Sequence, residues 1–168
     1  MTTTKMRTRF TVASTLLALS LSSLGGTAVA QTSPDHLRGA TAAQASEATT
    51  RATEGVWKRH IEAWGHHDLD AIMRDYNKDA VLVLNNQTYV GKAEIRKVFE
   101  RLFEIFGQGE NHIDTPTIKD RIVYITWHFA PNGRQAVFGT DSFVIEDDAI
   151  SYQTIASPLY ETYPVAAP

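Results

Sequence analysis

The period of the hydrophobic pattern changes once along the sequence, near residue 110, and this change restricts the possible folds most. Before it, between Gly91 and Gly107, apolar residues recur three and four positions apart, which predicts one long helix with a buried face. After it, from His112 onward, apolar and polar residues alternate. This alternation predicts strands near 113–118, 121–130, 134–146 and 149–157.

Shorter elements precede the long helix. Residues 56–64 carry an apolar stripe at helical spacing, and Asp68 stands where the N-cap of a second short helix with a stripe over 69–76 is expected. Residues 81–84 predict a buried strand, and 88–90 return beside it as a hairpin arm. Helices followed by an antiparallel sheet predict an α+β domain with the helices on one sheet face. If strongly curved, that sheet would wrap around the long helix as a cone.

The N-terminus has the three parts of a secretory signal peptide. Residues 1–30 begin with basic side chains, continue with an apolar run over 10–24 and end in Ala28-Val29-Ala30, so we expect cleavage before Gln31 and export. An uncleaved membrane anchor is the alternative, but the run is short and rich in Ser and Thr. The remaining chain divides into a flexible lead-in, one domain and a loose C-terminal tail, at 31–51, 52–157 and 158–168.

Composition excludes several classes of protein. Cleavage would remove three basic and no acidic residues, so the formal charge would change from −3 to −6, which argues against nucleic acid or anionic membranes as partners. The absence of cysteine excludes disulfides, thiol catalysis and Cys-based zinc sites. The sequence also lacks a GxSxG elbow, a P-loop and a GxGxxG motif, and no cofactor is expected.

Two buried ionisable residues are the candidates for chemistry. On the strand over 134–146, Asp141 shares a face with Val137, Phe143 and Ile145, so burial would raise the pKa of its carboxyl group unless a cation or hydrogen bonds compensate. The structural alternative is a carboxylate paired with backbone at a bulge near Gly139. His60 lies in the apolar stripe of the first helix, where it is either a hydrogen-bonded core residue or a functional group.

The other histidines give weaker signals. His66 and His67 precede Asp68, but adjacent side chains at a helix corner do not converge, and Asp68 is explained as a cap. His112 and His128 fall on separate predicted strands, and the sequence alone does not place them against each other. We therefore predict no metal site.

Four stretches of the sequence carry a resemblance to a known family, namely His67–Tyr76, Asp79–Val81, Tyr89–Ile95 and Gly139–Phe143. They resemble the nuclear transport factor 2-like superfamily, in its SnoaL-like and ketosteroid-isomerase-like branches, over about residues 52–157. The resemblance implies a cone-shaped α+β roll, an apolar cavity and a homodimer formed through the outer face of the sheet. It says little about the reaction.

The resemblance also implies positions for an active site. In ketosteroid isomerases, a tyrosine on the first helix and a protonated aspartic acid on a late strand bind the oxyanion, and a second aspartate shuttles the proton. By position these residues correspond to His60, Asp141 and Leu84 of this chain. Leucine cannot take up a proton, which argues against steroid isomerisation by that route.

Three hypotheses follow. In the first, the chain is an isomerase, dehydratase or cyclase for a small, flat, apolar substrate, with His60 as base and Asp141 as its orienting partner or as a neutral hydrogen-bond donor. In the second it binds such a molecule without turnover, and in the third it is a dimerisation module with a solid interior. The residues expected to contact the ligand are Trp57, Trp64, Tyr76, Leu84, Phe99, Phe103, Trp127 and Phe143.

Overall fold

A computed structural model describes residues 34–166, so the predicted signal peptide lies outside the described residues. The helices are α1 (Pro34–Gly65), α2 (Leu69–Arg74), α3 (Lys92–Phe106) and α4 (Leu159–Thr162). The strands are β1 (Tyr76–Leu84), β2 (Gln87–Val90), β3 (Gly109–Ile113), β4 (Thr117–Lys119), β5 (Ile122–Pro131), β6 (Val137–Glu146) and β7 (Ala149–Ala156). None of the described helices is long and apolar enough to cross a membrane.

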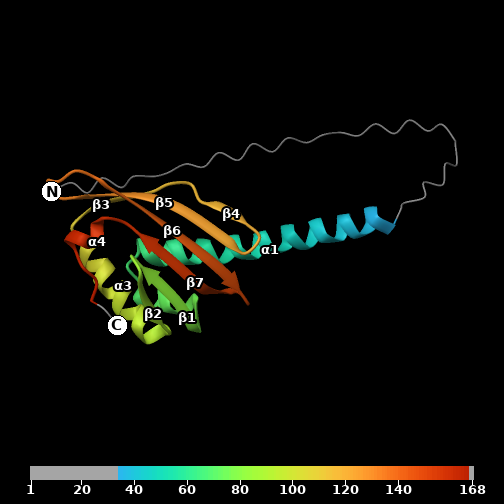
Figure 1. Ribbon diagram of the computed structural model, residues 1–168, viewed down its shortest axis with the longest axis horizontal. Coiled ribbons are helices and arrows are strands. Elements are labelled where there is room, and N and C mark those ends of the chain that lie inside the picture. Colours follow the sequence, from blue (N-terminus) through green and yellow to red (C-terminus); the bar gives the residue numbers. More distant parts are fainter. Residues whose placement is uncertain (1–33, 167–168) are drawn as a thin grey trace, which may run out of the picture. The chain divides into compact units, whose positions relative to one another are not determined.

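The strands form one curved sheet in the order β2-β1-β7-β6-β5-β3, and β4 pairs with β5 (Figure 1). All pairings are antiparallel except that of β1 with β7. Left-handed residues close two of the hairpins, Asn85-Asn86 after β1 and Asp147-Asp148 after β6. The α+β prediction is confirmed, and the single strand predicted over 113–118 is in fact two short strands, β3 and β4.

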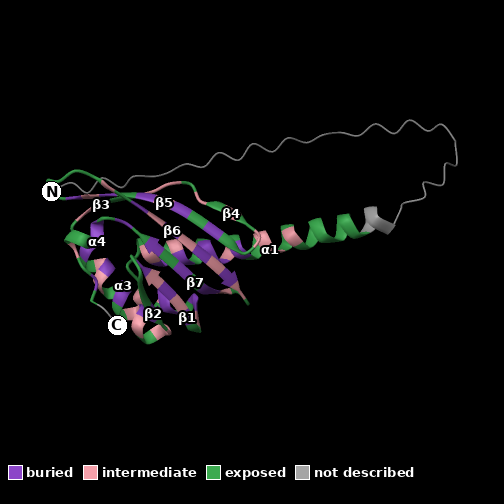
Figure 2. Ribbon diagram, in the orientation of Figure 1, coloured by how far each residue is buried: buried purple, intermediate pink, exposed green. Residues whose placement is uncertain are grey.

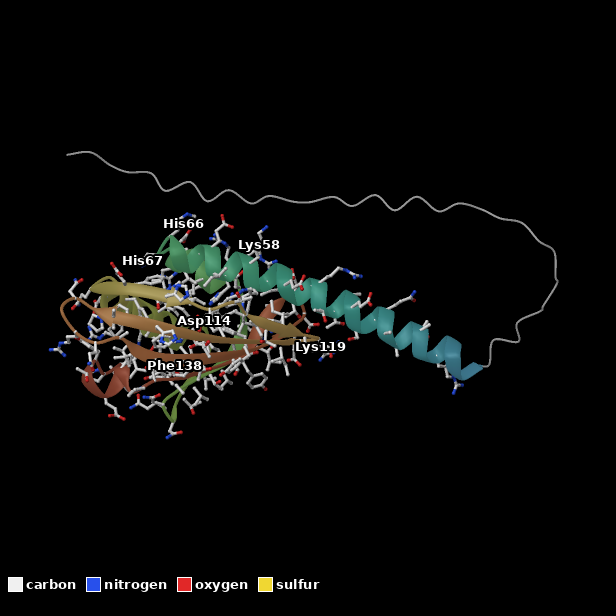
Figure 3. The ribbon with its side chains drawn as sticks, turned by 90° about the horizontal axis from the view of Figure 1, so that it is seen from above. Lys58, His66, His67, Asp114, Lys119 and Phe138 are labelled. Carbon is white, nitrogen blue, oxygen red and sulfur yellow. The ribbon has the colours of Figure 1, made fainter. Side chains whose placement is uncertain are left out.

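The core lies between the helices and the inner face of the sheet. The inward positions of β5, β6 and β7 alternate with exposed ones, as the period of two predicted (Figure 2). The apolar stripe of α3 is buried against this face, from Ile95 to Phe106. Figure 3, a view from above, shows α1 along one side of the sheet and Phe138 of β6 on the other. The site described below therefore lies between the helices and the sheet.

The segment over 31–51, predicted as a flexible lead-in, is helical from Pro34 onward, because α1 begins there. Proline suits the first helical position, and the alanines that follow favour a helix. The first half of α1 is mostly exposed, but the turn before β5 holds its middle, because Thr53 donates to the Asp120 carbonyl (2.6 Å) and Thr50 accepts from the Asp120 N–H (3.0 Å). The first half of α1 has too few apolar residues for the sequence to predict an ordered segment, and hydrogen bonds to Asp120 hold it instead.

The C-terminal segment, predicted as a loose tail over 158–168, packs against the rest of the domain over the residues that the structure describes. Leu159 and Tyr160 of α4 are buried, as is Val165. Hydrogen bonds fix the segment, since Tyr89 donates to the Ala166 carbonyl (2.8 Å) and Arg101 to the Pro164 carbonyl (3.2 Å). The prolines of the segment stop regular structure without preventing packing.

Candidate functional site

A narrow cavity lies between α1, α3 and the inner face of the sheet. The volume of the cavity is about 50 Å³. All three tryptophans of the chain line it, together with phenylalanine, leucine and isoleucine side chains. The polar side chains on its wall are His60, Asn111, Asp141, Gln153 and Tyr160.

The cavity continues into an open hollow between the ends of α1 and α3 and strand β3. Both spaces share residues on their walls, namely Ile61, Trp64, Phe106, Asn111 and Ile113. The indole of Trp64 packs against the rings of Phe103 and Phe106, each with ring centroids 5.2 Å apart. His67 stacks on Phe103 at 4.8 Å. The hollow is thus the entrance, and an aromatic cluster borders it.

His60 enters the cavity wall from α1 and is backed by a buried carboxylate. Its Nδ1 lies 3.5 Å from Oδ2 of Asp75. This distance is short enough for an ion pair, but the two atoms do not have the geometry of a hydrogen bond. Oδ1 of Asp75 accepts from Nε of Arg59 at 3.4 Å, so this carboxylate joins both side chains. A carboxylate beside Nδ1 favours the proton on that nitrogen, which leaves Nε2 as the acceptor. None of the described residues hydrogen-bonds Nε2.

Asp141 enters the cavity from β6 and accepts two hydrogen bonds. Trp127 Nε1–H donates to its Oδ1 and Gln153 Nε2–H to its Oδ2, both at 2.8 Å. Burial raises the pKa of the Asp141 carboxyl from 3.8 to about 6, although these two hydrogen bonds act in the opposite direction. Asp141 therefore changes its protonation state near neutral pH, which suits a group that donates or accepts protons.

Gly139 makes this arrangement possible. It pairs with Trp127 across β5 and β6, and a Cβ atom on Gly139 would lie only 2.0 Å from Cζ2 of the indole. The indole therefore lies over the glycine and reaches Asp141, two residues further along β6. The pairing passes through Gly139 without a shift of register, so the bulge of the structural alternative is not present there. Glycine is needed at this position because the indole of Trp127 occupies the space that a Cβ atom would fill.

Two tyrosines surround the Asp141 carboxyl group. The hydroxyl of Tyr76 donates to Oε1 of Gln153, and its ring packs edge-on against His60 with centroids 5.6 Å apart. Tyr160 comes from α4. Burial and the charge of Asp141 raise the pKa of both phenols well above 10.0, and Asp75 adds to the effect on Tyr76. Both tyrosines consequently keep their protons.

The structure brings most of the predicted site residues to one place. His60, Asp141 and five of the expected ligand contacts line the cavity, namely Trp57, Trp64, Phe99, Trp127 and Phe143. Tyr76 begins β1 instead of extending α2, and it contacts the wall residues from behind. Phe103 borders the entrance, whereas Leu84 is buried at the end of β1 and is absent from the cavity wall. The orienting partner expected for His60 is Asp75 and not Asp141.

Sequence reasoning missed the partners of the two ionisable residues. Asp75 is the last residue before β1 and its local pattern gives no signal, because His60 approaches it from another helix. Gln153 could have been found, since the alternation that places Ile155 inward also places Gln153 inward. Tyr160 lies in the segment predicted as a tail, and Asn111 lies in the segment that was expected to connect the long helix to the next strand.

The described histidines outside the cavity lie in two groups. Figure 3 shows His66 and His67 together at the end of α1. His112 and His128 face each other across β3 and β5, and their Nε2 atoms lie 3.4 and 3.8 Å from the Asp114 carboxylate. No group of three acidic or histidine side chains in the described part of the chain has the arrangement to hold a metal ion.

The sheet, the helices on its inner face and the lined cavity define a protein of the nuclear transport factor 2-like α+β class. Within that class the chain belongs to the SnoaL-like family, because the model of the SnoaL-like domain matches residues 57–153. None of the curated proteins compared with the chain matches it.

Solved structures agree on the fold. A candidate SnoaL-like polyketide cyclase from Jannaschia sp. CCS1 is 18% identical, with a TM-score of 0.57 over 70% of this chain and 94% of its own. A candidate ketosteroid isomerase from Kribbella flavida DSM 17836 is 11% identical, with a TM-score of 0.54 over 64% of this chain and 78% of its own. A de novo designed protein with a curved β-sheet is 11% identical, with a TM-score of 0.58 over 67% of this chain and 90% of its own. Because a designed protein shares the fold, function must be argued from the side chains.

Proposed function

We propose that the chain binds a small, flat, largely apolar molecule with one oxygen atom and transfers a proton on it. One observation carries this proposal: His60 with its partner Asp75, and Asp141 with a pKa near neutrality, open to the same apolar cavity. The reaction class is that of an isomerase, dehydratase or cyclase that needs no cofactor. Binding without turnover is the second candidate, because the same two groups would also fix a ligand's oxygen.

The proton transfer can be written from the residues. Asp141, when protonated, donates a hydrogen bond to the carbonyl oxygen of the ligand. Nε2 of His60 removes a proton from the neighbouring carbon, and the electron pair of the broken C–H bond forms the C=C bond of an enolate. The π pair of the C=O bond moves onto the oxygen, where the hydrogen bond from Asp141 stabilises the charge. The proton on His60 then returns to carbon, and Asp75 stabilises the imidazolium in between. Atoms and electrons balance within the ligand and these side chains.

The dimensions of the cavity restrict the ligand. In the described conformation its interior holds a few water molecules, so a ring-sized ligand requires side chains at the entrance to move. Trp64 is the side chain best placed for this, since it is half-buried and lines both the cavity and the outer hollow. We therefore infer that Trp64 moves when a ligand enters.

The test uses 2-indanone, a flat ketone with acidic C–H bonds next to its carbonyl group. In D₂O the protein should accelerate exchange of these hydrogens, followed by proton NMR. His60→Ala should lower the exchange rate by about 100-fold or more, because general base catalysis contributes that much. His128→Ala, a change to a histidine outside the cavity, is the matched control and should exchange like the unchanged protein.

Two results would contradict the enzyme proposal in different ways. If 2-indanone binds, seen as a change in the fluorescence of the three cavity tryptophans, but does not exchange, the chain is a binding protein. If exchange is equally fast in His60→Ala, the histidine is not the base. Asp141→Asn adds a second check, since it should weaken binding of 2-indanone without affecting indane, the hydrocarbon that lacks the oxygen.

We also propose that the outer face of the sheet pairs with a second copy of the chain. The support is a row of apolar side chains across three strands, Ile122, Val144 and Tyr152, which are register partners. Ile122 and Tyr152 are 53% and 52% exposed, as expected for a face that a partner covers.

The oligomeric state should change when this row is charged. Ile122→Glu combined with Tyr152→Glu places four carboxylates in the interface of a two-fold dimer, and we expect light scattering during gel filtration to report a monomer. Val90→Glu is the matched control, because Val90 is equally exposed (55%) but lies on β2, outside the row. A mass equal to that of the unchanged chain for the double variant would refute this interface.

A further inference from the structure

We propose that Tyr76 is a positioning residue which, through Gln153, keeps the proton of Asp141 available to a ligand in the cavity. This inference rests on the proposed function, in which Asp141 donates a hydrogen bond to the ligand's oxygen. Tyr76 is absent from the cavity wall and would act only through Gln153.

The direction of the hydrogen bonds carries the argument. The hydroxyl of Tyr76 donates to Oε1 of Gln153, so the amide must turn its Nε2–H toward Asp141, where it donates to Oδ2 at 2.8 Å. Trp127 Nε1–H, which can only donate, occupies Oδ1 at 2.8 Å. Each of the two protein groups bonded to Asp141 is therefore a donor. Neither can accept a proton from the carboxyl group.

This arrangement directs the proton of the neutral acid. When Asp141 is protonated, its O–H finds no acceptor in Trp127 or in the nitrogen of Gln153. The other polar side chains on the wall are His60, Asn111 and Tyr160, and none of them is hydrogen-bonded to Asp141 in the structure. An oxygen atom of a ligand bound beside Asp141 can therefore accept its proton. The network thus converts a buried carboxyl group into a hydrogen-bond donor for the ligand.

Without the hydroxyl of Tyr76 the same network would work against the ligand. Oε1 of Gln153 would lose its donor inside a buried site, where an unpaired carbonyl oxygen is costly. A rotation of the amide by half a turn would give this oxygen the proton of Asp141. The neutral acid would then be more stable than before, but its proton would point to Gln153 and not to the ligand.

Tyr76→Phe tests this inference through two measurements, the pKa of Asp141 and the affinity for 2-indanone. Carboxyl ¹³C NMR should show a pKa for Asp141 about one unit higher than in the unchanged protein. The affinity for 2-indanone at pH 5, measured by tryptophan fluorescence, should fall about tenfold, while that for indane should not change. If raising the pKa were the only effect, binding of the ketone would strengthen or stay the same.

Gln153→Met provides the second variant. It also removes a donor from the carboxylate, so the pKa of Asp141 should rise, but methionine offers the proton no strong acceptor. Affinity for 2-indanone at pH 5 should therefore fall less than in Tyr76→Phe. Equal losses in Tyr76→Phe and Gln153→Met would overturn the inference, since they would mean that any disturbance of the network weakens binding.

Tyr89→Phe is the control, because it removes a buried tyrosine hydroxyl that lies outside the cavity and donates to the Ala166 carbonyl. It should leave the preference for 2-indanone over indane unchanged. If the unchanged protein itself shows no such preference, the proposed function fails. If Asp141→Asn abolishes the preference and Tyr76→Phe does not, only the role of Tyr76 is refuted.

Discussion

Replacing Gly139 with alanine should lower the free energy of unfolding by about 3 kcal/mol or more, the largest loss that we expect from adding one methyl group. The new Cβ would lie 2.0 Å from Cζ2 and 2.4 Å from Cε2 of Trp127, far inside van der Waals contact. The indole cannot move away easily, because Phe106 packs against it at 5.3 Å and its Nε1–H donates to Asp141. The cost therefore combines overpacking with the loss of a hydrogen bond to a buried carboxylate.

Urea unfolding at pH 7 measures this loss. The control is Gly55→Ala, because Gly55 lies in α1 with nothing within 4 Å of an added Cβ. That substitution should stabilise the protein by about 0.5–1 kcal/mol, since alanine is the better helix former. If Gly139→Ala costs less than about 1 kcal/mol, the indole has another position available, and the packing argument for Gly139 is wrong.

Much of the fold could be predicted because the hydrophobic pattern reports it directly. The stripe of α3 and the alternation along β6 arise from local geometry, in which each side chain's direction depends only on its position in the element. The hydrophobic pattern does not predict the structure of segments that are held in place by contacts with other parts of the chain. Residues 34–51 show no regular apolar pattern, and the contact of Thr50 with Asp120 helps to hold them. The C-terminal segment is held in the same way by Tyr89 and Arg101.

The candidate site shows the same division. Alternation placed Asp141 inward, and helical spacing placed His60 inward, so the sequence identified two buried ionisable residues. Their partners depend on tertiary structure. Asp75 meets His60 through the packing of two helices, and Gln153 meets Asp141 through the register of β6 with β7. The sequence alone therefore paired His60 with Asp141, although each has a different partner.

The final prediction concerns pH. Because the pKa of Asp141 rises from 3.8 to about 6 on folding, the unfolded chain loses this proton at a lower pH than the folded protein. The stabilisation from the neutral carboxyl group is complete below pH 4 and is lost as pH rises through about 6. One pKa unit corresponds to about 1.4 kcal/mol, and the unfolded chain has already lost part of this proton at pH 4. Asp141 should therefore cost the folded state about 2 kcal/mol at pH 7 relative to pH 4.

Asp141→Asn removes this titration and keeps the size of the side chain. The difference in unfolding free energy between the variant and the unchanged protein should therefore shift by about 2 kcal/mol in favour of the variant between pH 4 and pH 7. Urea unfolding at several pH values measures it, and groups common to both proteins cancel in the difference. Asp79→Asn controls for the loss of one negative charge, because Asp79 is exposed. A difference that does not vary with pH would mean that the folded protein holds Asp141 as a carboxylate throughout, and a carboxylate could not donate the hydrogen bond that the proposed reaction needs.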